Sequence, residues 1–126
     1  MASVVEQFVS KINAHDLGGL IALMTTDHAF VDSLGNKSVR PVIEKGWEEY
    51  FAMVPDYWFR IDRTISDVDT SALVGEAGGT FVPKVGMPSP GNAWKTPAVW
   101  VARVEHGKVA EWRIFCDNEP IREKMG

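Results

Sequence analysis

The sequence predicts an α+β fold in which helices pack on one face of a curved antiparallel sheet. Two patterns carry this prediction. Before Pro55, apolar residues recur mostly every three or four positions, as in amphipathic helices. From Tyr57 onward they alternate with polar residues, as in half-buried strands. The expected order of elements along the chain is α-α-β-α-β-β-β-β.

The chain is long enough for one domain with a single core, which we assign to residues 1–126. Its 45% hydrophobic and 24% charged residues are typical of a globular protein. The net charge of -4 leaves no basic surplus to neutralise phosphates, so nucleic acids and anionic membranes are not expected partners. No apolar run reaches the ~18 residues of a membrane span, and no secretory signal is evident, so we expect a cytoplasmic protein.

The first two helices are predicted from their caps and apolar stripes. Ser3 and Glu6 have the spacing of a capping box, and Asp16 is placed to cap a second, short helix. The expected buried face of the first helix consists of Val5, Phe8, Val9 and Ile12. That of the second consists of Leu20, Leu23 and Met24.

A short strand over residues 28–32 is expected next, closed by a turn over residues 33–36. Pro41 suits the first position of a third helix, and Pro55 ends that helix. The apolar positions of this helix are Ile43, Trp47, Tyr50, Phe51 and Val54.

The second half of the chain is predicted to form four strands, joined in part by a Pro- and Gly-rich loop over residues 83–92. A two-residue turn at His106-Gly107 joins the last two strands. The expected strands cover residues 57–68, 72–82, 94–105 and 108–117, and a tail over residues 118–126 turns helical after Pro120.

Regular pairing from that turn predicts which residues of the last hairpin share a face. It places Trp100 opposite Arg113, Ala98 opposite Phe115 and Thr96 opposite Asp117. The other face, almost wholly apolar, would hold Val99, Val101, Trp112, Ile114 and Cys116. An apolar face of this kind must be covered by the protein's own helices or by a partner subunit.

Three strings, at residues 8–16, 27–35 and 107–117, together with the order of elements, resemble the nuclear-transport-factor-2-like fold. Within it the chain is similar to the SnoaL-like and ketosteroid-isomerase-like proteins. The resemblance implies a cone-shaped sheet around three N-terminal helices, an apolar pocket for a small hydrophobic molecule, a homodimer formed through the sheet, and no cofactor. Such proteins include isomerases, polyketide cyclases, epoxide hydrolases, dehydratases and pure binding proteins, so the fold does not settle the function.

Asp32 is the first candidate catalytic residue, because it resembles the general base of the isomerases. A carboxylate in an apolar pocket has its pKa raised by desolvation and can remove a proton next to a carbonyl. The alternative is an Asx-turn with residues 33–35. The tyrosine of the isomerase oxyanion hole corresponds to Phe8, which has no hydroxyl, and its aspartate falls near Trp100.

Asp117 is the second candidate, as an acid or second base, because it resembles the acidic residue at the end of the last strand in SnoaL-like cyclases. The alternative is a cap for the C-terminal tail. The resemblance also implies that Trp100 and Arg113 orient or polarise a substrate oxygen and that Phe115 lines the pocket. The alternative for Arg113 is a solvent-facing residue or a pair with Glu111.

Other aromatic residues are expected at the pocket or in the core. The helical spacing of Trp47, Tyr50 and Phe51 is typical of core residues, but in proteins of this kind the third helix covers the cavity, so all three are also candidates for its wall. Tyr57 is expected at the mouth of the cone. Cys116 alternates onto the apolar face, which predicts a buried or interface thiol.

The three histidines are scattered along the chain without metal-ligand spacing, so no metal site is expected. For His28, at the start of a strand, solvent exposure is expected, and the alternative is a place at the rim of the pocket. The leading hypothesis is an enzyme that uses aspartate acid–base chemistry on a small hydrophobic carbonyl compound, as an isomerase or a polyketide-cyclase-like enzyme. The alternatives are a hydrolase of the epoxide-hydrolase type and a non-catalytic protein that binds a hydrophobic ligand.

Overall fold

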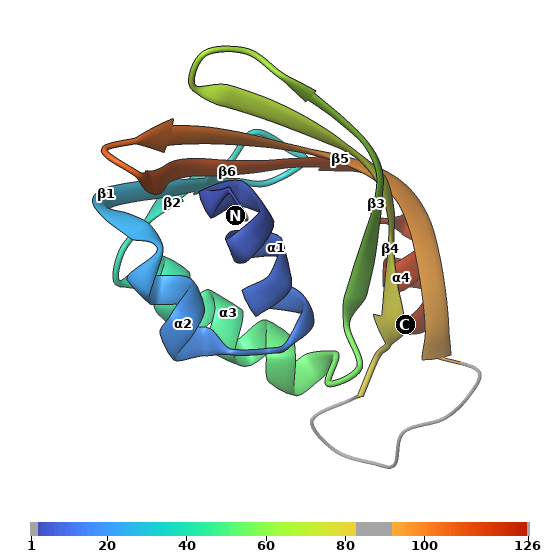
Figure 1. Ribbon diagram of the computed structural model, residues 1–126. Coiled ribbons are helices and arrows are strands. Elements are labelled where there is room, and N and C mark those ends of the chain that lie inside the picture. The colour runs from blue at the N-terminus through green and yellow to red at the C-terminus, as the bar shows by residue number, and fades with distance from the viewer. Residues whose placement is uncertain (1–2, 83–91, 126) are drawn as a thin grey trace.

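The computed structural model describes residues 3–82 and 92–125, and these residues form the predicted α+β fold (Figure 1). The predicted loop at residues 83–92 lies, apart from Asn92, outside the described residues. In chain order the elements are α1 (Val4–Asn13), α2 (Leu17–Ala22), β1 (Met24–Val31), β2 (Lys37–Val39), α3 (Val42–Met53), β3 (Trp58–Ser66), β4 (Thr70–Thr80), β5 (Ala93–Glu105), β6 (Lys108–Cys116) and α4 (Glu119–Met125).

The six strands form one sheet in the order β2-β1-β6-β5-β4-β3. It curves over α1, α2 and α3, which lie on its concave side (Figure 1). The sheet is not wholly antiparallel, because β1 runs parallel to β6. The three-residue strand β2 was not predicted; it pairs with the end of β1 directly after the turn. The last helix, α4, contacts β5.

The first two helices begin at the N-cap residues that the sequence predicts. The Ser3 hydroxyl accepts a hydrogen bond from the Glu6 amide at 3.1 Å, and the Asp16 carboxylate accepts one from the Gly19 amide at 2.9 Å. The prediction that Met24 belongs to the second helix is wrong, since α2 ends at Ala22 and Met24 starts β1 as a buried strand residue. The β-branched residues that follow Met24 favour the extended conformation. The third helix begins at Val42, one residue after the predicted Pro41.

The core fills the space between the helices and the concave face of the sheet. Its largest fully buried side chains include Trp100, Trp112, Phe8, Ile12 and Leu20, which come from two helices and two central strands. Burying a large apolar side chain contributes roughly 1.5–3 kcal/mol to folding. The contact between Phe8 and Trp112, whose ring centres lie 4.8 Å apart, therefore helps hold α1 against the sheet.

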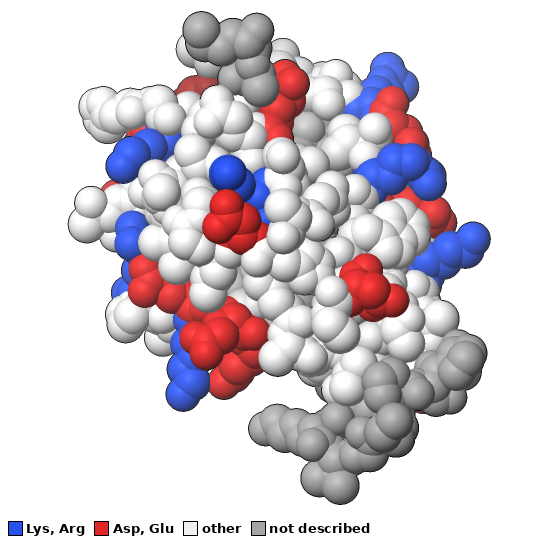
Figure 2. All heavy atoms as spheres, turned by 60° about the horizontal axis from the view of Figure 1, so that its bottom comes forward, with Lys and Arg blue, Asp and Glu red and all other residues white. Residues whose placement is uncertain are grey.

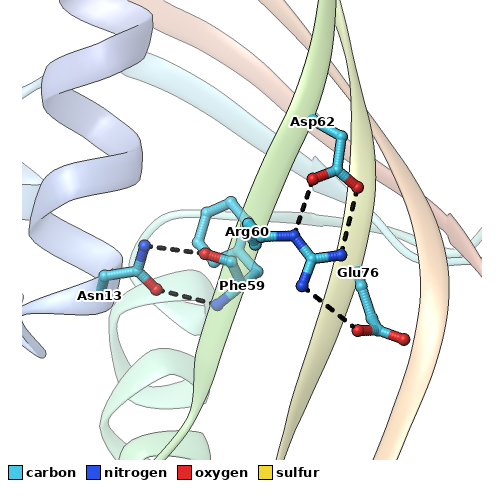
Figure 3. A network of polar contacts seen from close by, with 5 residues as sticks. All are labelled: Asn13, Phe59, Arg60, Asp62 and Glu76. Atoms are coloured by element: carbon cyan, nitrogen blue, oxygen red, sulfur yellow. Dashed lines mark hydrogen bonds and ion pairs between the residues drawn. The ribbon is translucent and has the colours of Figure 1, made fainter.

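Asn13, the last residue of α1, fixes the helix to the free edge of β3. Its amide Nδ2 donates to the Phe59 carbonyl at 3.0 Å, and its Oδ1 accepts from the Phe59 amide at 2.9 Å (Figure 3). The Asn13 side chain thus takes the place of a neighbouring strand. Next along β3, Arg60 forms ion pairs with Asp62 and Glu76 (Figure 3).

Charged residues on the face shown in Figure 2 are interspersed with a larger number of uncharged ones. Acidic and basic side chains lie near each other on this face, which forms no single basic stripe. None of the helices in the described ranges is both long and apolar enough to cross a lipid bilayer.

His28 is fully buried, so the prediction of an exposed side chain is wrong. Its Nδ1 hydrogen-bonds to the Val109 carbonyl at 2.6 Å and must therefore carry the proton. Nε2 is buried and has no hydrogen-bond partner within the described residues. Burial lowers the pKa of His28; the bond to Val109 and the charges of Asp27 and Glu111 oppose this, whereas the charge of Arg40 adds to it.

This buried imidazole predicts an acid-sensitive fold. Because the folded state holds His28 at a pKa below the ordinary value of about 6.5, the unfolded state binds a proton first as the pH falls. The free energy of unfolding should decline as the pH falls below about 6.5, by at most about 1.4 kcal/mol per pH unit from this group. Urea unfolding of wild type and His28→Asn between pH 8 and pH 5 measures the effect.

The asparagine can keep an N–H donor toward Val109 but cannot titrate, so its stability should depend less on pH than that of the wild type. Comparable stability of the two proteins at pH 8 is the control for an intact fold. Equal pH dependence of both proteins would contradict the assignment.

Candidate functional site

A mainly apolar cavity of about 320 Å³ lies between α3 and the concave face of the sheet. Its size is at the lower end of the range of small-molecule sites, roughly 300–1,000 Å³. The cavity is lined by Phe30, Asp32, Ser33, Ser38, Val42, Ile43, Gly46, Trp47, Tyr50, Tyr57, Trp100, Trp112, Ile114 and Asn118. Of the predicted pocket residues, Asp32, Trp47, Tyr57 and Trp100 therefore lie together.

One face of α3 supplies much of the cavity wall. Ile43, Trp47 and Tyr50 recur at helical spacing and point to the same side of the helix. Gly46 lies on this side as well, and a Cβ atom added there would meet no other atom within 4 Å. The absence of a side chain at Gly46 thus leaves space in the cavity.

The opposite wall comes from the last hairpin, whose register differs from the prediction. Trp100 lies opposite Ile114, and Val101 lies opposite Arg113. The register shifts near the turn, where Arg103 pairs with Glu111 but Val104 pairs with Val109, so Ala110 is an extra residue in β6. A shift of one residue moves every side chain of a strand to the other face.

The predicted pairs of Trp100 with Arg113, Ala98 with Phe115 and Thr96 with Asp117 are therefore wrong. Trp112 and Ile114 face the cavity instead, whereas Arg113 and Phe115 do not line it. Phe115 is 44% exposed, and the guanidinium carbon of Arg113 lies 4.9 Å from the centre of its ring.

Asp32 lines the cavity, but its carboxylate is engaged in the turn that follows β1. Its Oδ1 accepts hydrogen bonds from the backbone amides of Leu34 and Asn36, both at 2.9 Å. This is the Asx-turn that the sequence analysis gave as the alternative to a catalytic role of Asp32. Burial alone would raise the pKa of Asp32, but the hydrogen bonds from Asn36 and Leu34 outweigh it and hold the pKa below its ordinary value.

Asp117, the second predicted catalytic residue, is exposed and does not line the cavity. Its carboxylate accepts a hydrogen bond from the Glu119 amide at 2.9 Å, at the start of α4. This is the cap that was the alternative for this residue. The structure does not bring the two aspartates together in the cavity.

Two further aromatic residues named from the sequence belong to the core and not to the cavity wall. Phe8 is fully buried beside Trp112, with ring centres 4.8 Å apart. Phe51 is half-buried and stacks on His15 at 4.5 Å. Phe8 does not line the cavity, so its lack of a hydroxyl does not affect which hydrogen-bond donors the cavity offers.

The cavity has two tyrosines: Tyr57, expected at the mouth of the cone, and Tyr50, for which a place in the core or in the cavity wall was left open. Their rings meet edge to face, with centres 5.0 Å apart. Burial raises the pKa of both hydroxyls, and Cys116 nearby raises them further. Both hydroxyls therefore stay protonated at neutral pH and are able to donate hydrogen bonds to a ligand.

A polar cluster of Ser33, Cys116 and Asn118 was missed in the sequence. Asn118 Nδ2 donates to Ser33 Oγ at 2.8 Å, and the Cys116 thiol donates to Asn118 Oδ1 at 3.3 Å. Ser33 and Asn118 line the cavity. Their only signal in the sequence is that each directly follows one of the two candidate aspartates.

Metal chemistry has no evident site in the described part of the chain. Residues 3–82 and 92–125 contain no group of three or more His, Cys, Asp or Glu side chains that is placed to hold a metal ion.

Comparisons with known proteins agree with this architecture. The family model of the SnoaL-like domain matches residues 5–112. No curated protein matches the chain.

Several solved structures share the fold at low sequence identity. AclR from Streptomyces galilaeus, a proposed hydroxylase, is 21% identical with a TM-score of 0.80, over 98% of this chain and 82% of AclR. IdmH from Streptomyces antibioticus, a proposed polyketide cyclase, is 20% identical with a TM-score of 0.80, over 98% of this chain and 96% of IdmH. A nuclear-transport-factor-2-like protein from Burkholderia thailandensis is 17% identical with a TM-score of 0.79, over 100% and 99% of the two chains.

The turn geometry makes a direct prediction for Asp32. Its carboxyl should titrate below the ordinary value of about 3.9, because two backbone amides stabilise its charged form. Carbon-detected NMR of the side-chain carboxyl, assigned by the loss of its signal in Asp32→Asn, measures this. Because the folded pKa is the lower one, the stabilisation by this group is present above about pH 3.9 and is lost as the pH falls through the folded value. A pKa above 4 would contradict the geometry.

Proposed function

Because the chain belongs to the family of SnoaL-like domains, we propose that it is an enzyme that acts on a small, hydrophobic carbonyl compound by acid–base chemistry. The observation that carries the proposal is the cavity itself. It combines apolar walls with two protonated tyrosine hydroxyls and one carboxylate, that of Asp32. Apolar walls exclude water, and a few converging polar groups orient a ligand.

In the proposed reaction, the Asp32 carboxylate takes a proton from the carbon next to the substrate carbonyl. The electron pair of that C–H bond moves toward the carbonyl oxygen, which accepts hydrogen bonds from the Tyr50 and Tyr57 hydroxyls. Return of the proton to another carbon completes an isomerisation. Attack of the enolate carbon on a second carbonyl, with protonation of the resulting alkoxide, completes a cyclisation.

The hydrogen bonds of Asp32 limit its strength as a base. A carboxylate with a lowered pKa is fully ionised at neutral pH but accepts protons poorly. Stabilisation of the enolate by the two hydroxyls must then supply much of the rate. Chemistry that needs two carboxylates, as in the hydrolase alternative, is poorly supported because Asp117 is exposed and caps α4.

A non-catalytic binding protein is the second candidate, and the low pKa of Asp32 favours it. The same cavity would bind the same class of ligand, and Asp32 would serve only the turn. The two candidates differ in whether the bound carbonyl compound exchanges its acidic C–H protons.

Deuterium exchange into 1-tetralone, a small bicyclic ketone, distinguishes the two candidates. In D₂O the wild type should accelerate exchange next to the carbonyl, and Asp32→Asn should lose roughly 10²–10⁴-fold of that rate. Tyr50→Phe and Tyr57→Phe should each slow exchange without removing the base. The acid limb of the rate profile should lie below about pH 4, since Asp32 is ionised above it. If wild type and variants all bind the ketone without accelerating exchange, the enzyme is ruled out and the non-catalytic binding protein remains.

We further propose a homodimer that forms through the convex face of the sheet. Val74, Val99 and Phe115 are neighbours on three adjacent strands, and Val74 and Phe115 are 36% and 44% exposed. Arg113 flanks this patch and has a buried Nε without a hydrogen-bond partner among the described residues. A two-fold axis at Phe115 would set Arg113 against Asp117 of the partner subunit, because the two positions lie two residues on either side of Phe115.

Charge reversal tests this arrangement. Arg113→Asp should shift the protein from dimer to monomer in sedimentation equilibrium, because two aspartates would then face each other. The double variant Arg113→Asp with Asp117→Arg should restore the dimer. A wild type that stays monomeric at 100 μM, or a double variant no better than the single one, would refute the interface.

A further inference from the structure

The cluster of Ser33, Cys116 and Asn118 joins two segments that are far apart in the sequence. Ser33 follows β1, and Asn118 follows β6. Asn118 donates to Ser33 Oγ at 2.8 Å, and its Oδ1 accepts the Cys116 thiol at 3.3 Å. Both polar ends of the amide are therefore held, which fixes its orientation at the cavity wall.

This arrangement leaves an unused donor for a ligand, the second N–H of Asn118. One N–H of Asn118 is used by Ser33, and the second has no acceptor among residues 3–82 and 92–125. The Ser33 hydroxyl accepts the bond from Asn118, and the Cys116 sulfur, at 3.9 Å, is a distant and weak acceptor for its hydrogen. One of the two lone pairs of the amide oxygen, the obvious acceptor of the cluster, is used by the thiol, which also holds this oxygen toward Cys116.

The surroundings of the cluster argue for a neutral ligand atom. Among the described residues, the cavity wall contains no Lys or Arg, and its one carboxylate is Asp32, next to Ser33 in the chain. An anionic ligand would therefore meet a negative charge without a compensating positive one. Burial raises the pKa of the Cys116 thiol, so it remains protonated and keeps its bond to the amide.

From this geometry we infer that Asn118 selects ligands with a neutral hydrogen-bond acceptor, such as a ketone oxygen, and that Cys116 is the residue that positions it. The inference rests on the proposed function only in requiring that the cavity binds a small hydrophobic molecule. It adds the feature by which the cavity distinguishes such molecules. Asn118 touches the ligand, whereas Cys116 acts by turning the amide oxygen away from it.

The test compares 1-tetralone with tetralin, the same bicyclic molecule with a CH₂ group in place of the carbonyl. Dissociation constants come from two-dimensional NMR of the indole N–H signals, because Trp47, Trp100 and Trp112 line the cavity. The wild type should bind the ketone more tightly than the hydrocarbon. Asn118→Ala should reduce this preference about three- to tenfold, the range expected for one neutral hydrogen bond.

Cys116 variants separate a positioning role from a packing role. Cys116→Ala should reduce the preference for the ketone, whereas Cys116→Ser, which retains a donor to the amide oxygen, should preserve it. Asn118→Asp, nearly identical in shape, replaces the donor by an acceptor and should remove the preference even if the alanine variant folds poorly. Unchanged affinity for tetralin is the control for an intact cavity in every variant.

Two results would overturn this inference in distinguishable ways. If wild type binds both probes and Asn118→Ala or Asn118→Asp keeps the full preference for the ketone, the selection by Asn118 is wrong while the cavity remains a ligand site. If the wild type binds neither probe, the proposed function fails, and the inference fails with it.

Discussion

An irregular stretch of β6, Val109–Glu111, determines which side chains of the last hairpin enter the cavity. Ala110 is the extra residue against β5, and the pairing of β1 with β6 also shifts beside it, between Met24 and Ala29. The Val109 amide donates to the Leu23 carbonyl, and the Val109 carbonyl accepts from His28. A buried imidazole thus supplies a hydrogen bond that the interrupted strand pairing would leave unmade.

The cavity depends on this irregularity. It directs Trp112 and Ile114 inward beside Trp100, and it sends Arg113 and Phe115 to the convex face. Without the extra residue, a guanidinium would enter an apolar space that offers no carboxylate other than Asp32. Ala110 therefore keeps the hairpin wall of the cavity uncharged, and it places Phe115 and Arg113 on the convex face of the sheet.

Local signals predicted most of the fold from the sequence. The caps at Ser3 and Asp16, the helical stripe of α3 and the hairpin turn at His106-Gly107 all depend on neighbours within a few residues, and all are confirmed. The predictions are wrong where contacts with a distant segment of the chain determine the register of a strand or the burial of a side chain. Two successive apolar residues, Val109 and Ala110, interrupt the alternation, but this does not say which residue is inserted, because the bulge is fixed by pairing with two other strands. Likewise, the burial of His28 follows from a partner 81 residues away.

Within the candidate site, the sequence located Asp32 but not the hydrogen bonds that surround it. Asp32 is the base in the proposed reaction, yet the turn that fixes its place also donates the hydrogen bonds that would make it a weak one. Burial acts on Tyr50 and Tyr57 in the opposite sense, since it keeps their hydroxyls protonated as donors. A site with a weak base and several neutral donors gains most when charge develops on the ligand oxygen and not on the carboxylate. The proposed chemistry therefore depends on how well these donors meet that oxygen, so their orientation, for which we propose a role of Cys116, would matter as much as the base.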